Sequence, residues 1–151
     1  MFDSITVRKI TKNDKNKYFE MSRRFYEAGV TNSKITDEGR EKFFKEILSG
    51  EIVRGYFMCF NGKVAGYAVC AISASQEACG RVLWLDELYV DPEYRGKGVG
   101  TELFKFLETG DDYDYIRLEV EKDNDRAMKL YRSLGFKNAE YISLYKKVDE
   151  R

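Results

Sequence analysis

The stretch Leu88-Tyr-Val-Asp-Pro-Glu-Tyr-Arg-Gly-Lys-Gly-Val-Gly100 decides how this chain folds, because it joins a strand to a helix through a glycine-rich turn. The apolar run over residues 82–90 predicts the strand, and Pro92 ends it. Apolar residues at helical spacing then predict an amphipathic helix that begins within the glycines and ends near Gly110, on the positions Val99, Leu103, Phe106 and Leu107.

The glycine-rich turn has the chemistry of an anion site. Glycines at 96, 98 and 100 let the backbone pass close to a ligand, and the first N–H groups of a helix carry its positive dipole end. Arg95 and Lys97 add charge that can pair with phosphate oxygens. The spacing fits neither a Walker A loop nor the dinucleotide fingerprint. Glycines that serve only to pack the helix against the strand remain an alternative.

The segment before this turn predicts two helices and a hairpin. A short strand over 5–9 is followed by a helix over 13–26, closed by Gly29, and by a second helix from the N-cap Thr36 to Leu48, stopped by Gly50. Strands over 53–60 and 64–73 are joined by Asn61-Gly62, the dipeptide best suited to a tight primed turn.

The segment after the turn predicts a strand over 115–120, a helix around 127–134 closed by Gly135, and a strand over 136–148. The order β-α-α-β-β-β-α-β-α-β, with a break that could split the last strand in two, predicts a mixed α/β fold. We expect a single domain over residues 1–151, with a mostly antiparallel mixed sheet flanked by helices.

Composition limits the partners. Lys plus Arg and Asp plus Glu each number 26, so the balanced charge predicts neither a nucleic-acid nor a membrane partner. With no signal-like N-terminus or long apolar run, the sequence predicts a cytoplasmic protein. Cys59, Cys70 and Cys79 lack metal-site spacing, and the absence of histidine removes the commonest base and metal ligand. We therefore expect no metal.

Two motifs in order identify a family resemblance. Residues 88–100 resemble the acetyl-CoA-binding motif of the GNAT superfamily of N-acetyltransferases, Arg/Gln-x-x-Gly-x-Gly/Ala, which Arg95, Gly98 and Gly100 fill. A second stretch, Asn124-x-x-Ala127-x-x-Leu130-Tyr131-x-x-Leu134-Gly135-Phe136, resembles the later CoA-contacting helix of that family. The resemblance is strongest over residues 84–136.

The resemblance implies an enzyme that transfers acetyl from acetyl-CoA, as co-substrate, to an amine in a ternary complex. It places Tyr131 as the general acid and Asn124 on the CoA arm. The backbone of Leu88, Tyr89 and Val90 would run beside the pantetheine, and the pyrophosphate would be held by Arg95, Gly96, Lys97, Gly98, Val99, Gly100 and Thr101.

The candidate bases are carboxylates inside apolar strands, where a charge is costly unless it is paired or faces a wet cleft. Glu87 and Glu119 rank first and Asp86 second. Strand alternation predicts that Asp86 and Glu87 lie on opposite faces. A salt bridge from Glu119 to Arg117, or a water chain in place of any carboxylate, remains open.

An acidic bias over residues 111–125 favours a cationic small molecule or a protein amine as the acceptor. A solvated loop and a negatively charged helix start are the alternative, and they are the favoured interpretation of Asp123 and Asp125. The first two helices predict an aromatic wall for it, from Tyr18, Phe19, Phe25, Tyr26, Phe43 and Phe44. Two other functions remain open: a CoA-binding regulatory domain without turnover, and a structural domain. The oligomeric state is left open between a monomer and a homodimer.

Overall fold

The computed structural model describes residues 2–29, 34–110 and 112–148. Backbone contacts divide the chain into two compact units, residues 1–119 and 120–151. The first unit holds one sheet of five strands in the order β1-β2-β3-β4-β5. The predicted mixed α/β fold is confirmed in this unit, with the strands β1 (Ile5–Lys9), β2 (Val53–Phe60), β3 (Lys63–Ser75), β4 (Gly80–Val90) and β5 (Tyr115–Leu118).

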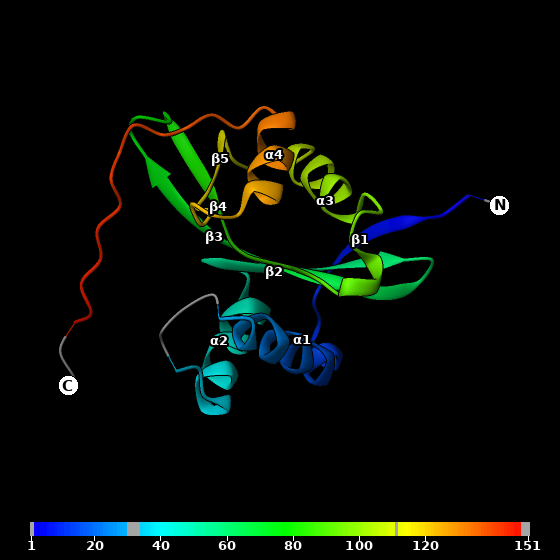
Figure 1. Ribbon diagram of the computed structural model, residues 1–151. Coiled ribbons are helices and arrows are strands. Elements are labelled where there is room, and N and C mark those ends of the chain that lie inside the picture. The colour runs from blue at the N-terminus through cyan, green and yellow to red at the C-terminus, as the bar shows by residue number, and fades with distance from the viewer. Residues whose placement is uncertain (1, 30–33, 111, 149–151) are drawn as a thin grey trace. The chain divides into compact units, whose positions relative to one another are not determined.

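Two helices follow β1 and lie on one face of the sheet, as Figure 1 shows. A short 3-10 turn, Lys12–Asp14, leads into α1 (Lys15–Glu27). The helix α2 (Asp37–Ser49) begins at Thr36, whose side chain accepts a hydrogen bond from the Gly39 N–H, and it ends at Gly50 with φ 69°. Both predicted ends of α2 are therefore confirmed.

The sheet is antiparallel from β1 to β4, and β5 pairs parallel with β4. The predicted hairpin turn is confirmed, since Asn61 and Gly62 both have positive φ, 49° and 83°. The parallel pairing joins Val82–Leu85 to Tyr115–Leu118 and stops there. Beyond Leu85, the edge of β4 that faces away from β3 is used by no strand pairing among the described residues.

A β-bulge interrupts β4 at the carboxylates. Val69 of β3 pairs with Glu87, but the next residue, Cys70, pairs with Leu85, so Asp86 is an extra residue. The bulge breaks the strict alternation that the sequence argument assumed. Glu87 is buried and Asp86 is exposed, and the placement of the two side chains on opposite faces stays a prediction.

The glycine-rich turn follows β4 and its own short 3-10 helix, Pro92–Tyr94. It leads into α3 (Val99–Glu108), which lies on the opposite face of the sheet from α1 and α2 (Figure 1). The predicted start of this helix within the glycines is confirmed. Its buried face carries Val99, Leu103, Phe104 and Leu107.

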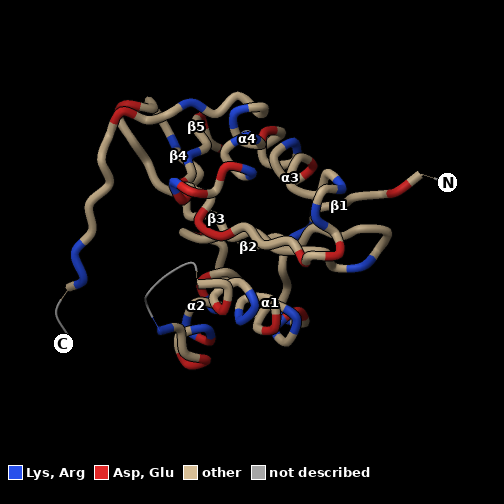
Figure 2. Tube along the Cα trace, in the orientation of Figure 1, with Lys and Arg blue, Asp and Glu red and all other residues tan. Residues whose placement is uncertain are grey.

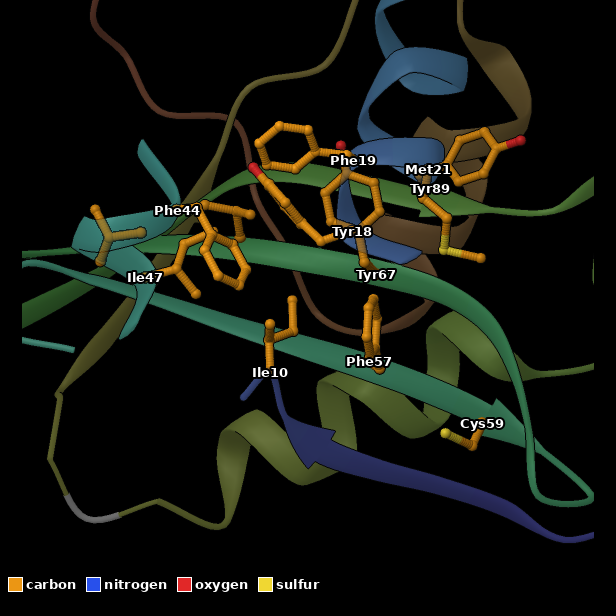
Figure 3. Close-up of a cluster of buried hydrophobic side chains, with 12 residues drawn as sticks. Ile10, Tyr18, Phe19, Met21, Phe44, Ile47, Phe57, Cys59, Tyr67 and Tyr89 are labelled. Carbon is orange, nitrogen blue, oxygen red and sulfur yellow. The ribbon is translucent and has the colours of Figure 1, made fainter. Parts of the chain in front are cut away.

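The core between the sheet and the first two helices is aromatic, and Figure 3 shows its side chains gathered from α1, α2 and the strands. Tyr18 and Tyr67 meet edge to face at 5.5 Å between ring centroids. Cys59 and Cys70 are buried and reduced, as expected for small core residues, and Cys79 is exposed. Charges of both signs alternate along α1 and α2 (Figure 2).

The second unit contains one helix, α4 (Asp125–Ser133), followed by Gly135 with φ 95°. The predicted strand over 136–148 is wrong, because the described tail forms no helix or strand. A strand requires a ladder partner, and no strand pairing includes these residues. Within the described parts of the chain, no helix has the length and apolar character needed to cross a membrane.

Candidate active site

Glu87 is the most deeply buried of the three predicted base candidates, with 8% of its surface exposed. Its Oε1 accepts a hydrogen bond of 2.7 Å from the Tyr67 hydroxyl, and the Tyr26 hydroxyl also favours the charged form of this carboxyl group. Burial raises the pKa of Glu87, while the hydrogen bonds from the two tyrosines oppose that rise. The result is a carboxyl group whose affinity for a proton is above that of an exposed glutamate.

The surroundings of Glu87 are apolar rings rather than water. Tyr67 also lies next to Tyr89, with 6.2 Å between centroids, and Phe25 contacts both rings at 6.2 and 6.5 Å. Figure 3 shows Tyr18, Tyr67 and Tyr89 within one cluster. Electrostatic interactions are stronger in such a low-dielectric setting, so charges near Glu87 act on it with little screening.

Arg40 of α2 provides a positive charge from the helix layer. It is 7% exposed, its Nε donates to Ser22 Oγ at 3.0 Å, and its Nη1 donates to Asp37 Oδ1 at 3.0 Å. Its charge lowers the pKa of Glu87, but this is a smaller effect than that of the hydrogen bonds. A buried guanidinium with fixed partners is thus part of the electrostatic environment of the carboxylate.

The other two candidate carboxylates lie at the end of the β4–β5 pairing. Glu119 directly follows β5 and is exposed, as is Asp86. Partial burial and then the negative charge of Glu119 raise the pKa of Asp86. The alternative of a Glu119–Arg117 salt bridge is not formed between these two described residues, and the Arg117 guanidinium lies 4.7 Å from the Trp84 ring centroid instead.

The glycine-rich turn forms the second part of the candidate site. Gly96 and Gly98 have φ 76° and 88°, a conformation that favours glycine, and Gly98 is the N-cap of α3. In the described part of the chain, no side chain caps this helix start. Its first N–H groups are therefore suited to bind an external anion.

Two cations of the turn rest against aromatic rings. Arg95 donates from Nε to the Val90 carbonyl at 2.9 Å and lies 5.9 Å from the Tyr89 ring centroid. Lys97 lies 5.2 Å from the Phe60 ring centroid. Arg95 thus fastens the turn to the last residue of β4, so the predicted pantetheine edge and the predicted pyrophosphate turn are adjacent.

The remaining predicted residues belong to the second unit. Asn124 caps α4, because its Oδ1 accepts from the Ala127 N–H at 3.2 Å. Tyr131 is half-buried, its ring lies 5.9 Å from that of Phe136, and burial raises its pKa. Glu87 and the turn both belong to the first unit, whereas Asn124 and Tyr131 are described only within the second.

The predicted aromatic wall is partly wrong. Tyr18, Phe19 and Phe44 are buried core residues that pack on one another, so they cannot line a cleft. Phe25, Tyr26 and Phe43 are half-buried and remain candidates. Tyr67 and Arg40 are functional residues that the sequence pattern did not indicate, although a carboxylate in an apolar strand requires buried donors.

The side chains contain no evident metal centre. Among the residues that the structure describes, no group of three or more His, Cys, Asp or Glu side chains is arranged to hold an ion.

Comparison with known proteins gives a consistent result. The sequence model of the acetyltransferase (GNAT) family matches residues 16–136. An uncharacterized N-acetyltransferase of Methanocaldococcus jannaschii is 27% identical over 147 residues, which are 94% of this chain and 65% of that relative. The chain therefore spans less than two thirds of that protein. Thialysine N-epsilon-acetyltransferase of Sus scrofa is 30% identical over 146 residues, 87% of this chain and 84% of the relative.

A solved structure shares the fold. An aminoglycoside N-acetyltransferase in complex with CoA superposes with a TM-score of 0.78 at 19% identity, covering 97% of both chains.

Proposed function

The chain belongs to the GNAT acetyltransferase family, and from that membership we propose that it is an acetyl-CoA-dependent N-acetyltransferase acting on a primary amine in a ternary complex. The observation that carries the proposal within the chain is the buried carboxylate of Glu87, in the strand that precedes a glycine-rich helix start with no side-chain cap. A proton acceptor and an anion-binding turn in one β-turn-α unit are the parts that acetyl transfer to an amine requires.

Acetyl-CoA fits the turn for chemical reasons. The backbone over residues 95–101 offers N–H donors and the positive end of α3 to the pyrophosphate, with Arg95 and Lys97 as nearby charges. The edge of β4 over Leu88, Tyr89 and Val90, which no strand pairing among the described residues uses, is the proposed site of the pantetheine, and Asn124 is the proposed contact from the second unit. Val90 N–H is the proposed donor to the carbonyl oxygen as it gains charge.

The proposed reaction is a direct transfer. The nitrogen lone pair of the amine forms a bond to the acetyl carbonyl carbon, and the carbon–sulfur bond then breaks with its electron pair on sulfur. Glu87 takes the proton that the nitrogen loses, and Tyr131 gives its hydroxyl proton to the sulfur. Solvent restores both groups, so the products are an N-acetylated amine and CoA. Glu119, acting directly or through water, is the alternative acceptor of the proton.

We propose a cationic small molecule or a protein amine as the acceptor. The relatives support this class, because one carries the name of a thialysine N-epsilon-acetyltransferase and others that of an aminoglycoside N(6')-acetyltransferase. Phe25, near the C-terminal end of α1 and half-buried, is the aromatic residue that we propose to contact it.

Thiol release from acetyl-CoA, measured against a panel that includes lysine analogues, aminoglycosides and peptide amines, tests the proposal. We expect turnover with at least one cationic amine, and a loss of about a hundredfold in kcat/KM for Glu87→Gln. Glu108→Gln, an exposed carboxylate on α3, is the matched control. Tight CoA binding without turnover on any amine would instead support a regulatory domain.

Tyr131→Phe tests the proposed acid separately. It removes the hydroxyl and keeps the ring, so kcat should fall while the affinity for CoA is retained. Equal turnover by this variant would remove Tyr131 from the mechanism.

A further inference from the structure

Glu87 is held by two tyrosines from different layers of the fold. Tyr67 comes from the neighbouring strand β3 and is fully buried, and its hydroxyl lies 2.7 Å from Glu87 Oε1. Tyr26 comes from the last turn of α1 and is half-buried. The hydrogen bond from Tyr67 restricts the rotation of the carboxylate from the sheet side, and the Tyr26 hydroxyl favours the charged form from the helix layer.

Both tyrosines remain donors at ordinary pH. Burial, and then the charge of Glu87, raises the pKa of Tyr67 and of Tyr26, so neither hydroxyl competes with Glu87 for a proton. Phenylalanine at either position would fill almost the same apolar volume without burying a hydroxyl. The hydroxyl groups are therefore explained by the carboxylate rather than by packing.

We propose that Tyr67 and Tyr26 are positioning residues, which hold the Glu87 carboxylate oriented and ready to accept the proton of the acceptor amine. This inference rests on the proposed function, since it assigns the support of the base rather than the base itself. Neither tyrosine touches the reacting atoms in this account. They act through Glu87, by fixing its rotamer and favouring its ionised form.

The charged and titratable groups that face Glu87 come from four elements. Tyr67 on β3, Tyr26 on α1 and Arg40 on α2 all favour the carboxylate form, and Asp86 on β4 opposes it. Tyr18 on α1 is a further neighbour, because the charge of Glu87 contributes to its raised pKa. Desolvation is the largest influence and also opposes the carboxylate form. Removal of a tyrosine hydroxyl should therefore raise the proton affinity of Glu87.

The test uses Tyr67→Phe and Tyr26→Phe, with Tyr56→Phe as the matched control. Tyr56 is equally a buried tyrosine, 5% exposed, but it lies on β2 and packs against Phe106. The pH profile of kcat/KM is measured for each, together with the titration of the Glu87 carboxyl carbon by NMR. The Glu87 resonance is assigned by its absence in Glu87→Gln.

We expect the acidic limb of the profile to shift toward higher pH by about one unit in each tyrosine variant, because one favourable interaction with the charged carboxylate is lost. At low pH this is about a tenfold loss of kcat/KM, and at high pH the variants approach the wild type. A purely structural defect would lower kcat/KM equally at every pH. The control should follow the wild type.

The outcomes separate the two proposals. If the wild type turns over and neither the profile nor the NMR titration of Tyr67→Phe and Tyr26→Phe differs from that of Tyr56→Phe, the positioning role is overturned. If the titration moves but no amine is acetylated, the proposed function fails while the two hydrogen bonds stand. Should Tyr67→Phe not fold, Tyr26→Phe decides the matter, because its half-buried site tolerates the change more easily.

Discussion

At the scale of single residues, Glu87 makes the stability of the fold depend on pH. Burial raises its pKa in the folded state. As the pH rises, the Glu87 carboxyl therefore loses its proton at a lower pH in the unfolded chain than in the folded one. Between the two pKa values the folded state binds more protons, and the free energy of unfolding therefore falls as pH rises. This loss of stability begins near the ordinary glutamate pKa of 4.5 and is complete above the raised pKa of Glu87.

Glu87→Gln should remove this dependence. We expect the stability of the variant relative to the wild type to increase as pH rises through that window, because glutamine carries no charge to bury. Urea unfolding followed by the fluorescence of Trp84, the single tryptophan, measures it at a series of pH values. The exposed Glu108→Gln should show no such trend, and a parallel trend in both variants would contradict the assignment to Glu87.

The identity of the buried carboxylate could be predicted from the sequence, but its hydrogen-bond partner could not. The sequence indicates Glu87 because a carboxylate interrupts an apolar strand. It does not indicate Tyr67, because the contact of Tyr67 with Glu87 depends on the register of β3 with β4, and a one-residue bulge at Asp86 sets that register. Nothing in the local pattern of either strand reports where a bulge falls.

At the scale of elements, the turn before α3 depends on glycine at one position in particular. Gly98 has φ 88°, and a Cβ there would reach only Ile5 Cδ1, at 4.0 Å. The cost of a side chain is therefore conformational rather than steric. Gly98→Ala should lower the free energy of unfolding by about 1–2 kcal/mol, and Gly98→Asn by less, since asparagine accepts positive φ more readily. Urea unfolding ranks the two, and equal losses would contradict this origin.

The N-terminus of α2 gives a second prediction at this scale. Thr36 accepts from the Gly39 N–H at 3.0 Å, so Thr36→Ala should cost about 1 kcal/mol of stability. Thr36→Ser keeps the oxygen and should cost much less. Thermal unfolding of the two variants side by side measures the difference, and an equal loss would show that the methyl group, not the cap, is responsible.

Elements with local signals could be predicted well. Caps and turns such as Thr36, Gly50 and Asn61-Gly62 act within a few residues, and the helices and the hairpin formed where they indicated. The structure of residues 136–148 could not be predicted in this way, because their aromatic and β-branched composition favours a strand only when a neighbouring strand offers a ladder of hydrogen bonds. The described tail has none, and its Ile142 and Leu144 are 90% and 88% exposed.

At the scale of the whole molecule, ligand binding should report on the folding equilibrium. A ligand that binds only the folded state stabilises it by mass action, by about 2.7 kcal/mol at a hundredfold excess over its Kd. For a chain of 151 residues this corresponds to a rise in Tm of about 5–10 °C. We expect such a rise with acetyl-CoA, measured by thermal unfolding.

Two comparisons make that measurement decisive between the functions that the sequence left open. Adenosine at the same concentration lacks the pyrophosphate and should give little shift, because the proposed contacts at the start of α3 are made to phosphate oxygens. Gly98→Ala should reduce the shift with acetyl-CoA, since a strained turn presents its N–H groups less well. A shift without turnover would favour a regulatory domain. No shift at all would mean that the glycines only pack α3 against the sheet, and both CoA-dependent functions would then be wrong.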